Sequence, residues 1–365
     1  MTVLDRRALN RASLARQHLL ERASVPVLDA VAHLGGLQAQ EPQEPYTGLW
    51  SRLAGFDPAE LSAHLAGRRV VRTHLMRRTV HLVTAEDALT WRSRHDAMLR
   101  QRLLGVYRRD LAAVDLDELA DLGGRLLAQE PRTLPEVGRE LAARWPDVAP
   151  RVLGESVGTL VPVVQVPPRG LWGEVGPARC LLVASWLGRP VDPPVADGTD
   201  PVGETLVLRY LAAHGPAASA DLRAWSGLAG LPAAVAAVRD RLVGFRDERG
   251  RELLDLPDAP RPDPDTPAPV RFLPAFDNAI LGYDDRRRII DDADRGLSVA
   301  GERVVLVDGR VAATWTTSAD AAVTVTPRRR VTRAERTAVG EEGRALAGFL
   351  SGGAHHRVTV AASPR

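Results

Sequence analysis

The stretch Val70-Val-Arg-Thr-His-Leu-Met-Arg-Arg-Thr-Val-His-Leu-Val83 consists of two runs rich in β-branched residues with Met-Arg-Arg between them. Runs of this kind favour strands, and their close spacing predicts a hairpin. Arginines gather in and just before it, at Arg68, Arg69, Arg72, Arg77 and Arg78. A basic hairpin that follows a set of helices is typical of a winged-helix module, a variant of the helix-turn-helix that binds DNA.

The residues before the hairpin provide the helices that such a module needs. Apolar residues recur at helical spacing from Asp5 to Leu20 and from Val27 to Leu34, and a further helix is predicted from Pro58 to Ala66. Gly35-Gly36 ends the second of these helices, because glycine readily takes the left-handed conformation. Two prolines keep Leu37 to Pro45 out of a helix, so we predict a loop there.

The same order of elements recurs twice downstream. The second round has helices over Leu116 to Leu127, Thr133 to Ala143 and Val152 to Leu160, and a strand over Val161 to Val166. The third has helices over Gly203 to His214, Ser219 to Trp225 and Leu231 to Arg241, and a hairpin over Leu242 to Leu254 that turns at Asp247 to Gly250. We therefore predict three winged-helix modules in tandem, at residues 1–115, 116–196 and 197–260.

The remainder of the chain has a different character. Residues 257–269 are rich in proline and aspartate, which predicts an extended linker with no packed structure of its own. Beyond it we predict strands over Arg303 to Trp315 and Ala321 to Val325, and a helix over Arg333 to Leu350. The expected fold class is therefore α+β, with tandem winged-helix (helix-turn-helix) modules and a C-terminal β-rich α+β region at 261–365.

The composition excludes several kinds of chemistry. All 48 basic residues are arginine, because the sequence contains no lysine. A Schiff base on a lysine side chain, which strand-cleaving glycosylases use, is therefore excluded, and only the N-terminal amine of Met1 or Thr2 could replace it. Cys180 is the only cysteine, so neither an internal disulfide nor a multi-cysteine zinc or iron–sulfur site can form within the chain.

Charge and hydropathy limit the possible binding partners and the cellular compartment of the protein. The formal net charge is only +2, so a DNA-binding surface has to come from local clustering of arginines. The first residues lack a long apolar run, and no stretch approaches the about 18 uninterrupted apolar residues of a membrane span. We expect a cytoplasmic monomer with no membrane contact, and the sequence implies no protein partner.

Four stretches resemble one protein family. His33-Leu-Gly-Gly-Leu-Gln-Ala-Gln-Glu-Pro42 is similar to the signature loop of a bacterial winged-helix DNA-binding family that contains the AlkZ-type and YcaQ-like DNA glycosylases, which unhook interstrand crosslinks. Arg72 to Val83, Val166 to Gly173 and Phe272 to Tyr283 resemble further stretches of that family in the same order, so the resemblance covers nearly the whole chain. The chain departs from the family at Arg77-Arg78-Thr79, where an arginine followed by glycine is favoured.

The resemblance implies that Gln38 and Gln40 are catalytic, because the family's catalytic element is glutamine, an apolar residue, then glutamine or aspartate. Residues two apart in an extended segment point to the same side, so both amides could orient one water against the sugar C1′ while Ala39 packs inward. A glutamine is hardly basic, so any general base has to be Glu41, Glu44, a histidine or bulk water. The alternative is that both glutamines only satisfy backbone groups in a turn rich in glycine and proline.

We expect DNA-binding residues in three places. The hairpin contributes Arg72, Arg77, Arg78 and His81, the turn after the second round's strand contributes Arg169 and Trp172, and the arginine run beyond the linker contributes Arg329 and Arg330. Arginine contacts phosphate at any sequence, and tryptophan can stack on a base or wedge into a groove. The alternatives are solvated faces for the arginines, and core packing for the histidine and the tryptophan.

The predicted function is a monofunctional DNA glycosylase for bulky N7-alkylated guanine in duplex DNA, crosslinks included. An N7-alkylated guanine carries a positive charge and leaves as a neutral molecule, so no acid catalyst is needed.

We predict no cofactor and no metal, because Asp277, Asp284 and Asp285 lack both accompanying histidines and a calcium-loop pattern. The resemblance also implies self-resistance to a DNA-alkylating natural product. Two alternatives stay open: a noncatalytic transcriptional regulator, and a resistance protein that sequesters the drug or shields the adduct.

Overall fold

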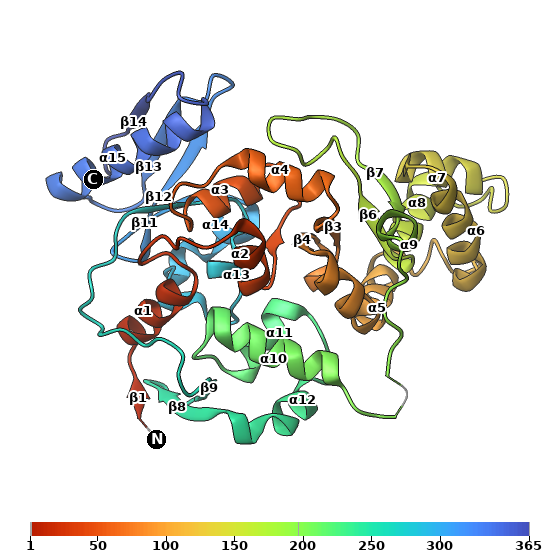
Figure 1. Cartoon of the computed structure of the whole chain (residues 1–365), viewed down its shortest axis with the longest axis horizontal. Coiled ribbons are helices and arrows are strands. Elements are labelled where there is room, and N and C mark those ends of the chain that lie inside the picture. The colour runs from red at the N-terminus through yellow and green to blue at the C-terminus, as the bar shows by residue number, and fades with distance from the viewer. Residues whose placement is uncertain (1, 196, 365) are drawn as a thin grey trace.

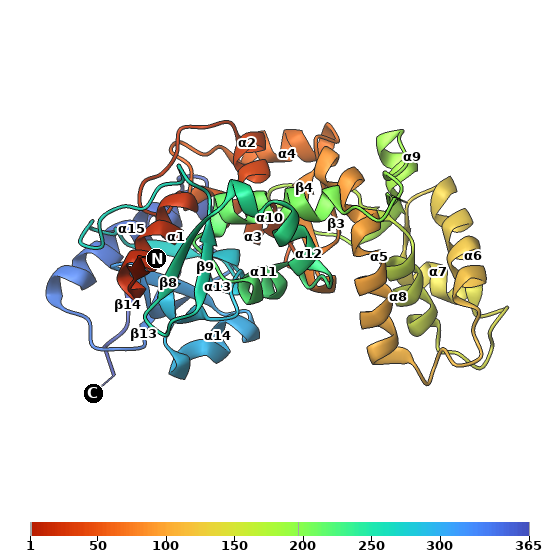
Figure 2. The ribbon, with the colours of Figure 1, turned by 90° about the horizontal axis from the view of Figure 1, so that it is seen from below.

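The computed structural model describes residues 2–195 and 197–364, and it has a mixed α+β fold (Figures 1 and 2). Within these residues the strands form three sheets, of three, five and six strands. No described helix is both long enough and apolar enough to cross a bilayer.

The N-terminal segment alternates short helices with the strands of the predicted hairpin. Its elements are α1 (Arg6–Arg16), α2 (Val27–His33), β2 (Leu37–Gln38), α3 (Glu44–Trp50), α4 (Pro58–Ala66), β3 (Val70–His74), the 3-10 turn η1 (Met76–Arg78), β4 (Val80–Thr84) and α5 (Ala85–Tyr107). The hairpin is confirmed as β3 and β4, which pair antiparallel from Val70 with Thr84 to His74 with Val80. Thr84 also caps α5 by accepting a hydrogen bond from the Asp87 amide, so α5 begins directly where β4 ends.

The second segment repeats this order. Its elements are α6 (Leu116–Gln129), β5 (Arg132–Thr133), α7 (Leu134–Leu141), α8 (Pro150–Leu160), β6 (Val163–Gln165), β7 (Arg179–Leu182) and α9 (Val183–Leu187). Helices α7 and α8 are in backbone contact, because a Cβ added to Gly138 would lie 1.9 Å from the Pro150 carbonyl oxygen. A Cβ on Gly154 would lie 2.1 Å from the Leu134 carbonyl oxygen, so only glycine permits this approach on either helix.

The third segment follows the predicted pattern closely. Its elements are α10 (Pro201–His214), α11 (Ser219–Ser226), α12 (Leu231–Ala237), the 3-10 turn η2 (Arg239–Arg241), β8 (Val243–Asp247) and β9 (Glu252–Asp255). The hairpin turns at the expected residues, where the Gly250 amide donates to the Asp247 carbonyl oxygen at 2.9 Å. The N-terminal strand β1 (Val3–Leu4) pairs in parallel with β8 and completes a three-stranded sheet.

The three segments share one connectivity. In each of them a short strand or a single bridge comes before the last two helices and pairs antiparallel with the last strand of the hairpin. These pairs are β2 with β4, β5 with β7, and Ala217 with Leu254 of β9. The order of helices and strands therefore recurs three times, at the places where the sequence predicted it.

One six-stranded sheet joins the first two segments, in the order β2-β4-β3-β6-β7-β5. The joint is the antiparallel pairing of β3 with β6, through Arg72 with Gln165 and Thr73 with Val164. The sequence did not predict this pairing. It places the β3–β4 hairpin inside a sheet with both edges occupied, whereas a free wing would project into solvent. The strands of predicted modules 1–115 and 116–196 consequently share one sheet.

The predicted linker has neither helix nor strand at 257–269, as expected. It is nevertheless fixed to the protein, because arginines of α1 bind its carbonyl groups. The Arg7 Nε donates to the Pro264 carbonyl oxygen at 2.7 Å, and the Arg11 Nε donates to the Thr266 carbonyl oxygen at 2.7 Å. The sequence predicted an extended linker with no packed structure of its own, and it did not predict these contacts with α1.

The C-terminal region contains a five-stranded sheet covered by the long helix α15 (Figure 1). Its elements are β10 (Arg271–Leu273), α13 (Asn278–Leu281), η3 (Arg286–Arg288), η4 (Asp292–Asp294), α14 (Arg295–Ala300), β11 (Arg303–Val307), β12 (Arg310–Thr317), β13 (Val323–Pro327), α15 (Arg333–Leu350) and β14 (Val358–Val360). The predicted helix at 333–350 is confirmed, and the second predicted strand corresponds to β13. The prediction of one strand over 303–315 was wrong, because the chain turns at Asp308-Gly309, where both residues have positive φ.

Two buried ion pairs join the N-terminal helices to distant segments. Arg16 of α1 pairs with Asp255 of β9 at 2.6 Å, and neither side chain is exposed. Arg52, just after α3, pairs with Asp277 at 2.7 Å. Because the removal of one partner leaves an uncompensated buried charge, each of these contacts constrains the packing of the segments it joins.

Replacement of Gly138 by alanine tests the contact between α7 and α8. Gly138→Ala should destabilise the protein by about 1–3 kcal/mol, because the added methyl group has no room beside Pro150. The matched control is Gly124→Ala in α6, whose Cβ would have its nearest neighbour 3.9 Å away and which should gain up to about 1 kcal/mol from helix propensity. Urea melts measure both effects. Equal stability of Gly138→Ala and the wild type would contradict this packing.

The buried histidines predict how stability depends on pH. His95 and His214 are fully buried, and burial lowers their pKa to about 4 and about 3, respectively. In the unfolded chain a histidine titrates at about pH 6.5, so below this pH the unfolded state binds protons that the folded state does not. The free energy of unfolding should therefore be fully retained above about pH 6.5 and fall towards pH 4, by up to about 1.4 kcal/mol per pH unit for each histidine.

Urea melts at pH 7 and pH 5 check this dependence on pH. His95→Gln should remove part of the slope, because glutamine does not titrate. A free energy of unfolding that stays constant between the two pH values would contradict the burial of both histidines as neutral rings.

Candidate active site

The predicted catalytic loop lies directly against the hairpin. A Cβ on Gly36 would lie 2.5 Å from the Val83 Cγ1, so glycine allows the chain to come close to β4. The φ of Gly36 is +88°, a conformation that other residues rarely adopt. The two residues of β2 then pair with β4, which places Gln38 opposite His81.

The two glutamines of the loop have different surroundings. Gln38 is buried, and its Oε1 accepts a hydrogen bond of 2.9 Å from the Arg77 Nη2. Gln40 is exposed, and its Oε1 accepts from the Val80 amide at 3.4 Å. Ala39 between them is fully buried, as expected. In this structure Gln40 therefore only accepts a hydrogen bond from a backbone amide, as in the alternative reading of the loop. Gln38 instead binds a charged side chain.

Arg77 lies at the turn of the hairpin with a φ of 57°. Its Nη2 donates to the oxygens of Gln38 and Asn278, the latter at 3.0 Å, and its Nη1 donates to the Trp225 carbonyl oxygen. Among the described residues no carboxylate forms an ion pair with it. Burial, with a smaller contribution from Arg286, lowers the pKa of the Arg77 guanidinium to about 10. Arg77 therefore remains charged at neutral pH and brings a positive charge to two amide side chains.

A cavity of about 20 Å³ opens beside these amides. Its polar lining comprises Gln17, Gln38, Glu44, Arg52, Asp277 and Asn278. A space of this size holds about one water molecule, provided that polar groups surround it. The cavity is far too small for a purine base.

Arg77 also lines an open cleft of about 1430 Å³, whose lining comes mainly from α5, α11 and α12. The charged residues of the lining are Arg77, Arg102, Arg108, Arg223 and Asp284. Arg77 is engaged with its three acceptors, and the other three arginines against a single acid in one concave surface favour a polyanion such as a nucleic-acid backbone. Through Arg77 this cleft is connected to Gln38 and to the small cavity.

Arg72 and His81, which the sequence placed on the DNA-binding surface, lie inside the protein. Arg72 is 1% exposed, and its Nη2 donates to the Ala39 carbonyl oxygen at 2.9 Å. His81 is fully buried, and both burial and the nearby Arg77 keep its pKa well below the ordinary range. The side chains of β3 and β4 project from the faces of the sheet, and the loop after β6 covers Arg72, because a Cβ on Gly170 would lie 2.9 Å from the Arg72 Cδ. In this structure neither residue can reach a phosphate.

Arg169 and Trp172 occupy the loop between β6 and β7. The Trp172 ring is half-buried, with its centroid 4.9 Å from that of Tyr46 and 5.0 Å from that of Phe349. The Arg169 Nη1 donates to the Gly176 carbonyl oxygen at 2.9 Å, within the same loop. The packing alternative for the tryptophan therefore matches its position, and the arginine stabilises the loop.

The remaining predicted DNA-binding arginines lie apart from the cleft lining. Arg78 is half-buried beside Arg77, also with a positive φ of 63°. Arg329 is exposed and pairs with Glu335 at 2.8 Å, which lowers the pKa of that carboxyl group to about 2. Arg330 is exposed. The structure thus brings Gln38 and Arg77 together and leaves the C-terminal arginines on a separate surface.

The buried carboxylate nearest the loop already accepts hydrogen bonds from other residues. Glu44 is buried, and it accepts hydrogen bonds from the Ala275 amide at 2.7 Å and the Arg303 Nε at 2.9 Å. A carboxylate held in this way is a poor general base, because its lone pairs are engaged. Glu41 is exposed, so it and bulk water remain as proton acceptors.

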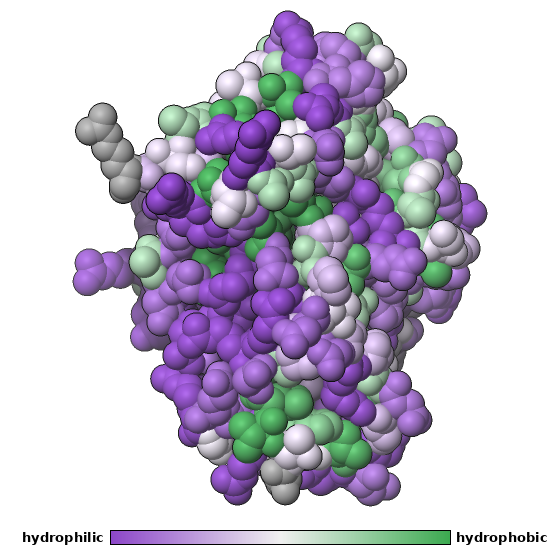
Figure 3. Space-filling view, turned by 90° about the vertical axis from the view of Figure 1, so that its left-hand side faces the viewer, coloured by the Kyte–Doolittle hydropathy of each residue, from purple (hydrophilic) through white to green (hydrophobic). Residues whose placement is uncertain are grey.

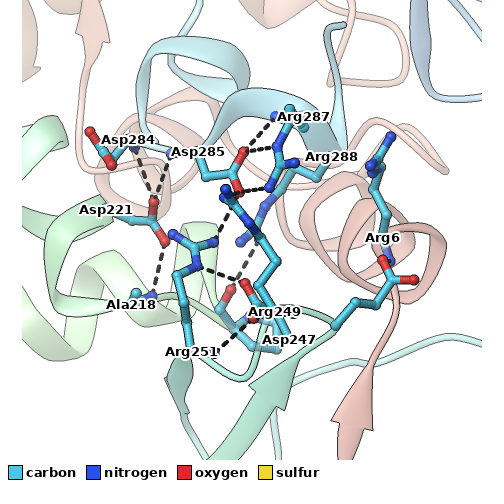
Figure 4. A network of polar contacts seen from close by, with 12 residues as sticks. Arg6, Ala218, Asp221, Asp247, Arg249, Arg251, Asp284, Asp285, Arg287 and Arg288 are labelled. Carbon is cyan, nitrogen blue, oxygen red and sulfur yellow. Dashed lines mark hydrogen bonds and ion pairs between the residues drawn. The ribbon is translucent and has the colours of Figure 1, made fainter. Parts of the chain in front are cut away.

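Asp284 and Asp285 belong to a network of polar contacts behind the cleft (Figure 4). Asp285 accepts from the Arg287 Nη2 at 2.7 Å and from the Arg251 Nη2 at 3.1 Å, and these arginines lower its pKa. Buried Asp221, in the first turn of α11, accepts from the Asp284 amide at 3.0 Å. The network therefore holds the segment that follows α13 against α11. Asn278 of α13 and Trp225 of α11 carry two of the acceptors that Arg77 binds.

Several residues of this site were not identified from the sequence. Asn278 lies within the Phe272–Tyr283 stretch, whose resemblance to the family was the available signal. Arg102 and Arg223 lie on separate helices and carry no local motif, so only the folded arrangement brings them to one cleft.

Known proteins resemble this chain in sequence and in fold. The family model described as DNA glycosylase AlkZ-like matches residues 31–349. Among solved structures the chain is similar to the Streptomyces sahachiroi DNA glycosylase AlkZ, with a TM-score of 0.79 and 22% sequence identity over 99% of this chain and 100% of that chain. No curated protein matches the sequence. The structural likeness establishes the fold, and the match of the family model over most of its length shows that the chain belongs to the AlkZ-like DNA glycosylase family.

Proposed function

We propose that this chain is a monofunctional DNA glycosylase that hydrolyses the N-glycosidic bond of bulky N7-alkylated guanines in duplex DNA. The observation that carries the proposal is the Gln38 amide, which borders a cavity for one water and is bound by an arginine of the basic cleft. Preorganised hydrogen-bonding groups of this kind are a major source of catalysis in enzymes without metals.

We further infer that the three repeated segments are winged-helix modules and that duplex DNA lies in the cleft. The pairing of an early short strand with the last hairpin strand in every segment supports the first inference. Arg102, Arg108 and Arg223 along the cleft support the second, because arginines bind phosphate without regard to sequence. Exposed bases are not required for such binding.

The proposed chemistry suits a site with few free acids. An N7-alkylated guanine is cationic and leaves as a neutral base, so the departing group needs no proton. Water then attacks C1′ of an oxocarbenium-like sugar, as in glycoside hydrolysis. Since the chain has no lysine, no Schiff base forms on a side chain, and the product is an abasic site in an unbroken strand.

We also propose that the protein acts as a monomer and protects a producer of DNA-alkylating compounds. Figure 3 supports the first part, because the face that lies to the left in Figure 1 is mainly hydrophilic and has only small apolar patches. Large exposed apolar patches would instead favour a protein interface. Excision of one attachment point of a crosslink by the same reaction would support the protective role.

Base release tests the catalytic loop. Purified protein is incubated with duplex DNA that carries a bulky N7-alkylguanine, and the released base is measured by mass spectrometry. Gln38→Ala should lower the rate on the order of 100-fold, and Gln38→Ala/Gln40→Ala should leave only spontaneous release. Gln129→Ala is the control, because Gln129 is exposed at the end of α6. Tight DNA binding by the wild type without release would favour a regulator, and tight binding of the free drug would favour sequestration.

Salt dependence of binding tests the cleft. Arg102→Ala/Arg223→Ala should weaken binding of undamaged duplex DNA and reduce the slope of log K against log salt by about 2, because each lost phosphate contact removes about 0.9. Arg125→Ala is the matched control on exposed α6. Fluorescence anisotropy over a range of salt concentrations gives both slopes. An unchanged slope in the double variant would place the DNA elsewhere.

A further inference from the structure

The Arg77 guanidinium donates hydrogen bonds to three oxygen atoms, and it has no acceptor atom of its own. Its guanidinium donates to the Gln38 Oε1 at 2.9 Å, the Asn278 Oδ1 at 3.0 Å and the Trp225 carbonyl oxygen. A guanidinium carries only donors, so each amide must face it with the oxygen. A reversed amide would place its NH2 group against the guanidinium NH groups, and both hydrogen bonds would be lost. The donor side of each amide therefore faces away from Arg77.

The position of Arg77 is itself fixed by the surrounding backbone. A Cβ on Gly227, at the end of α11, would lie 3.3 Å from the Arg77 Cα and 3.3 Å from its amide nitrogen, so α11 ends directly against this residue. The left-handed φ of Arg77 is an unfavourable conformation that its contacts have to maintain. Because no carboxylate among the described residues pairs with Arg77, the two amides are its principal side-chain partners.

The two amide nitrogens are available to a ligand. The Asn278 Nδ2 is buried without a hydrogen-bond partner, and the Gln38 Nε2 forms no hydrogen bond, in both cases within residues 2–195 and 197–364. Both residues line the cavity for one water. We propose that Arg77 is a positioning residue that holds Gln38 and Asn278 with their NH2 groups towards the substrate, so that Gln38 acts as a hydrogen-bond donor.

This inference rests on the proposed glycosylase function and deepens it. When the bond between C1′ and N9 breaks, its electron pair stays on the base, and the acceptor atoms of the purine gain electron density. The cavity that both amides line is too small for the base, so the amide NH2 groups reach these atoms through the one water that the cavity holds. This contact is stronger with the departing base than with the intact nucleotide, which lowers the barrier. The oxygen of the attacking water forms the new bond to C1′, and the proton of this water leaves to solvent. Arg77 touches none of the reacting atoms in this scheme and acts through Gln38.

Replacement of Gln38 by glutamate separates donor from acceptor chemistry. Gln38→Glu keeps the shape and an oxygen for Arg77 but removes the NH2 group. We expect base release to fall about 100-fold while the melting temperature stays equal or rises, because the new carboxylate can pair with Arg77. Gln129→Glu controls for the added charge on exposed α6. A rate for Gln38→Glu within about threefold of the wild type would overturn the donor role.

Replacement of Arg77 separates positioning from contact with phosphate. Arg77→Met should lower the single-turnover rate at saturating protein at least about tenfold, with the Kd for undamaged duplex changed less than about threefold. Arg77→Lys should recover part of the rate, because lysine is also a pure donor. A weakened Kd with an unchanged single-turnover rate would assign Arg77 to phosphate binding and overturn the positioning role. If the wild type releases no base, the proposed function fails; if it does and Gln38→Glu matches it, only this inference fails.

Discussion

The pairing of β2 with β4 is the constraint on which the site depends. The hairpin of β3 and β4 is bonded along both edges, to β2 on one side and to β6 on the other. A shift by one residue would turn every side chain of a strand to the opposite face, so this double pairing fixes the register. Gln38 lies opposite His81 for this reason, and the turn of the same hairpin brings Arg77 back to the Gln38 amide. The close approach of Gly36 to β4 allows the pairing to begin.

Local signals in the sequence predicted much of the fold. Caps, glycines and prolines marked the repeated helices, and the Asp247–Gly250 turn marked the third hairpin. Helix α5 was not predicted, because its buried stripe contains Arg92 and His95 between the apolar residues of its two halves, and these polar residues interrupt the apolar pattern. The Asp308-Gly309 pair is a recognised hairpin signal, yet the apolar residues around it read as one strand.

The candidate site was predicted only in part, for a physical reason. The loop with Gln38 could be located from its motif, but the burial of Arg72 and His81 could not, because charged residues are ordinarily exposed. Arg72 is covered by Gly170 of the loop after β6, and His81 lies opposite Gln38 of β2, so both depend on segments that are distant in the sequence. The contact of Gln38 with Asn278 through Arg77 joins residues about 240 positions apart, and no local pattern encodes it.

Four arginines in or near the core have two different kinds of partner. Arg16 and Arg52 are bound to carboxylates and hold the N-terminal helices to distant segments, as a forked guanidinium is suited to do. Arg72 and Arg77 each bind a neutral oxygen of the loop that carries Gln38, and they have no carboxylate partner among the described residues. A buried charge without an opposite charge is costly, so its presence at the loop favours a role in the site over one in stability.

The absence of lysine, together with the burial of Cys180, limits how readily electrophiles react with the side chains of this protein. Thiolates and free amines are the groups that alkylating agents attack most readily in proteins. Cys180 is 2% exposed, and burial raises the pKa of its thiol to about 12, so the thiolate is scarce and shielded. Every basic side chain other than histidine is a guanidinium, which stays protonated and is a weak nucleophile. Compounds that alkylate guanine in DNA therefore find few groups to modify on the folded chain.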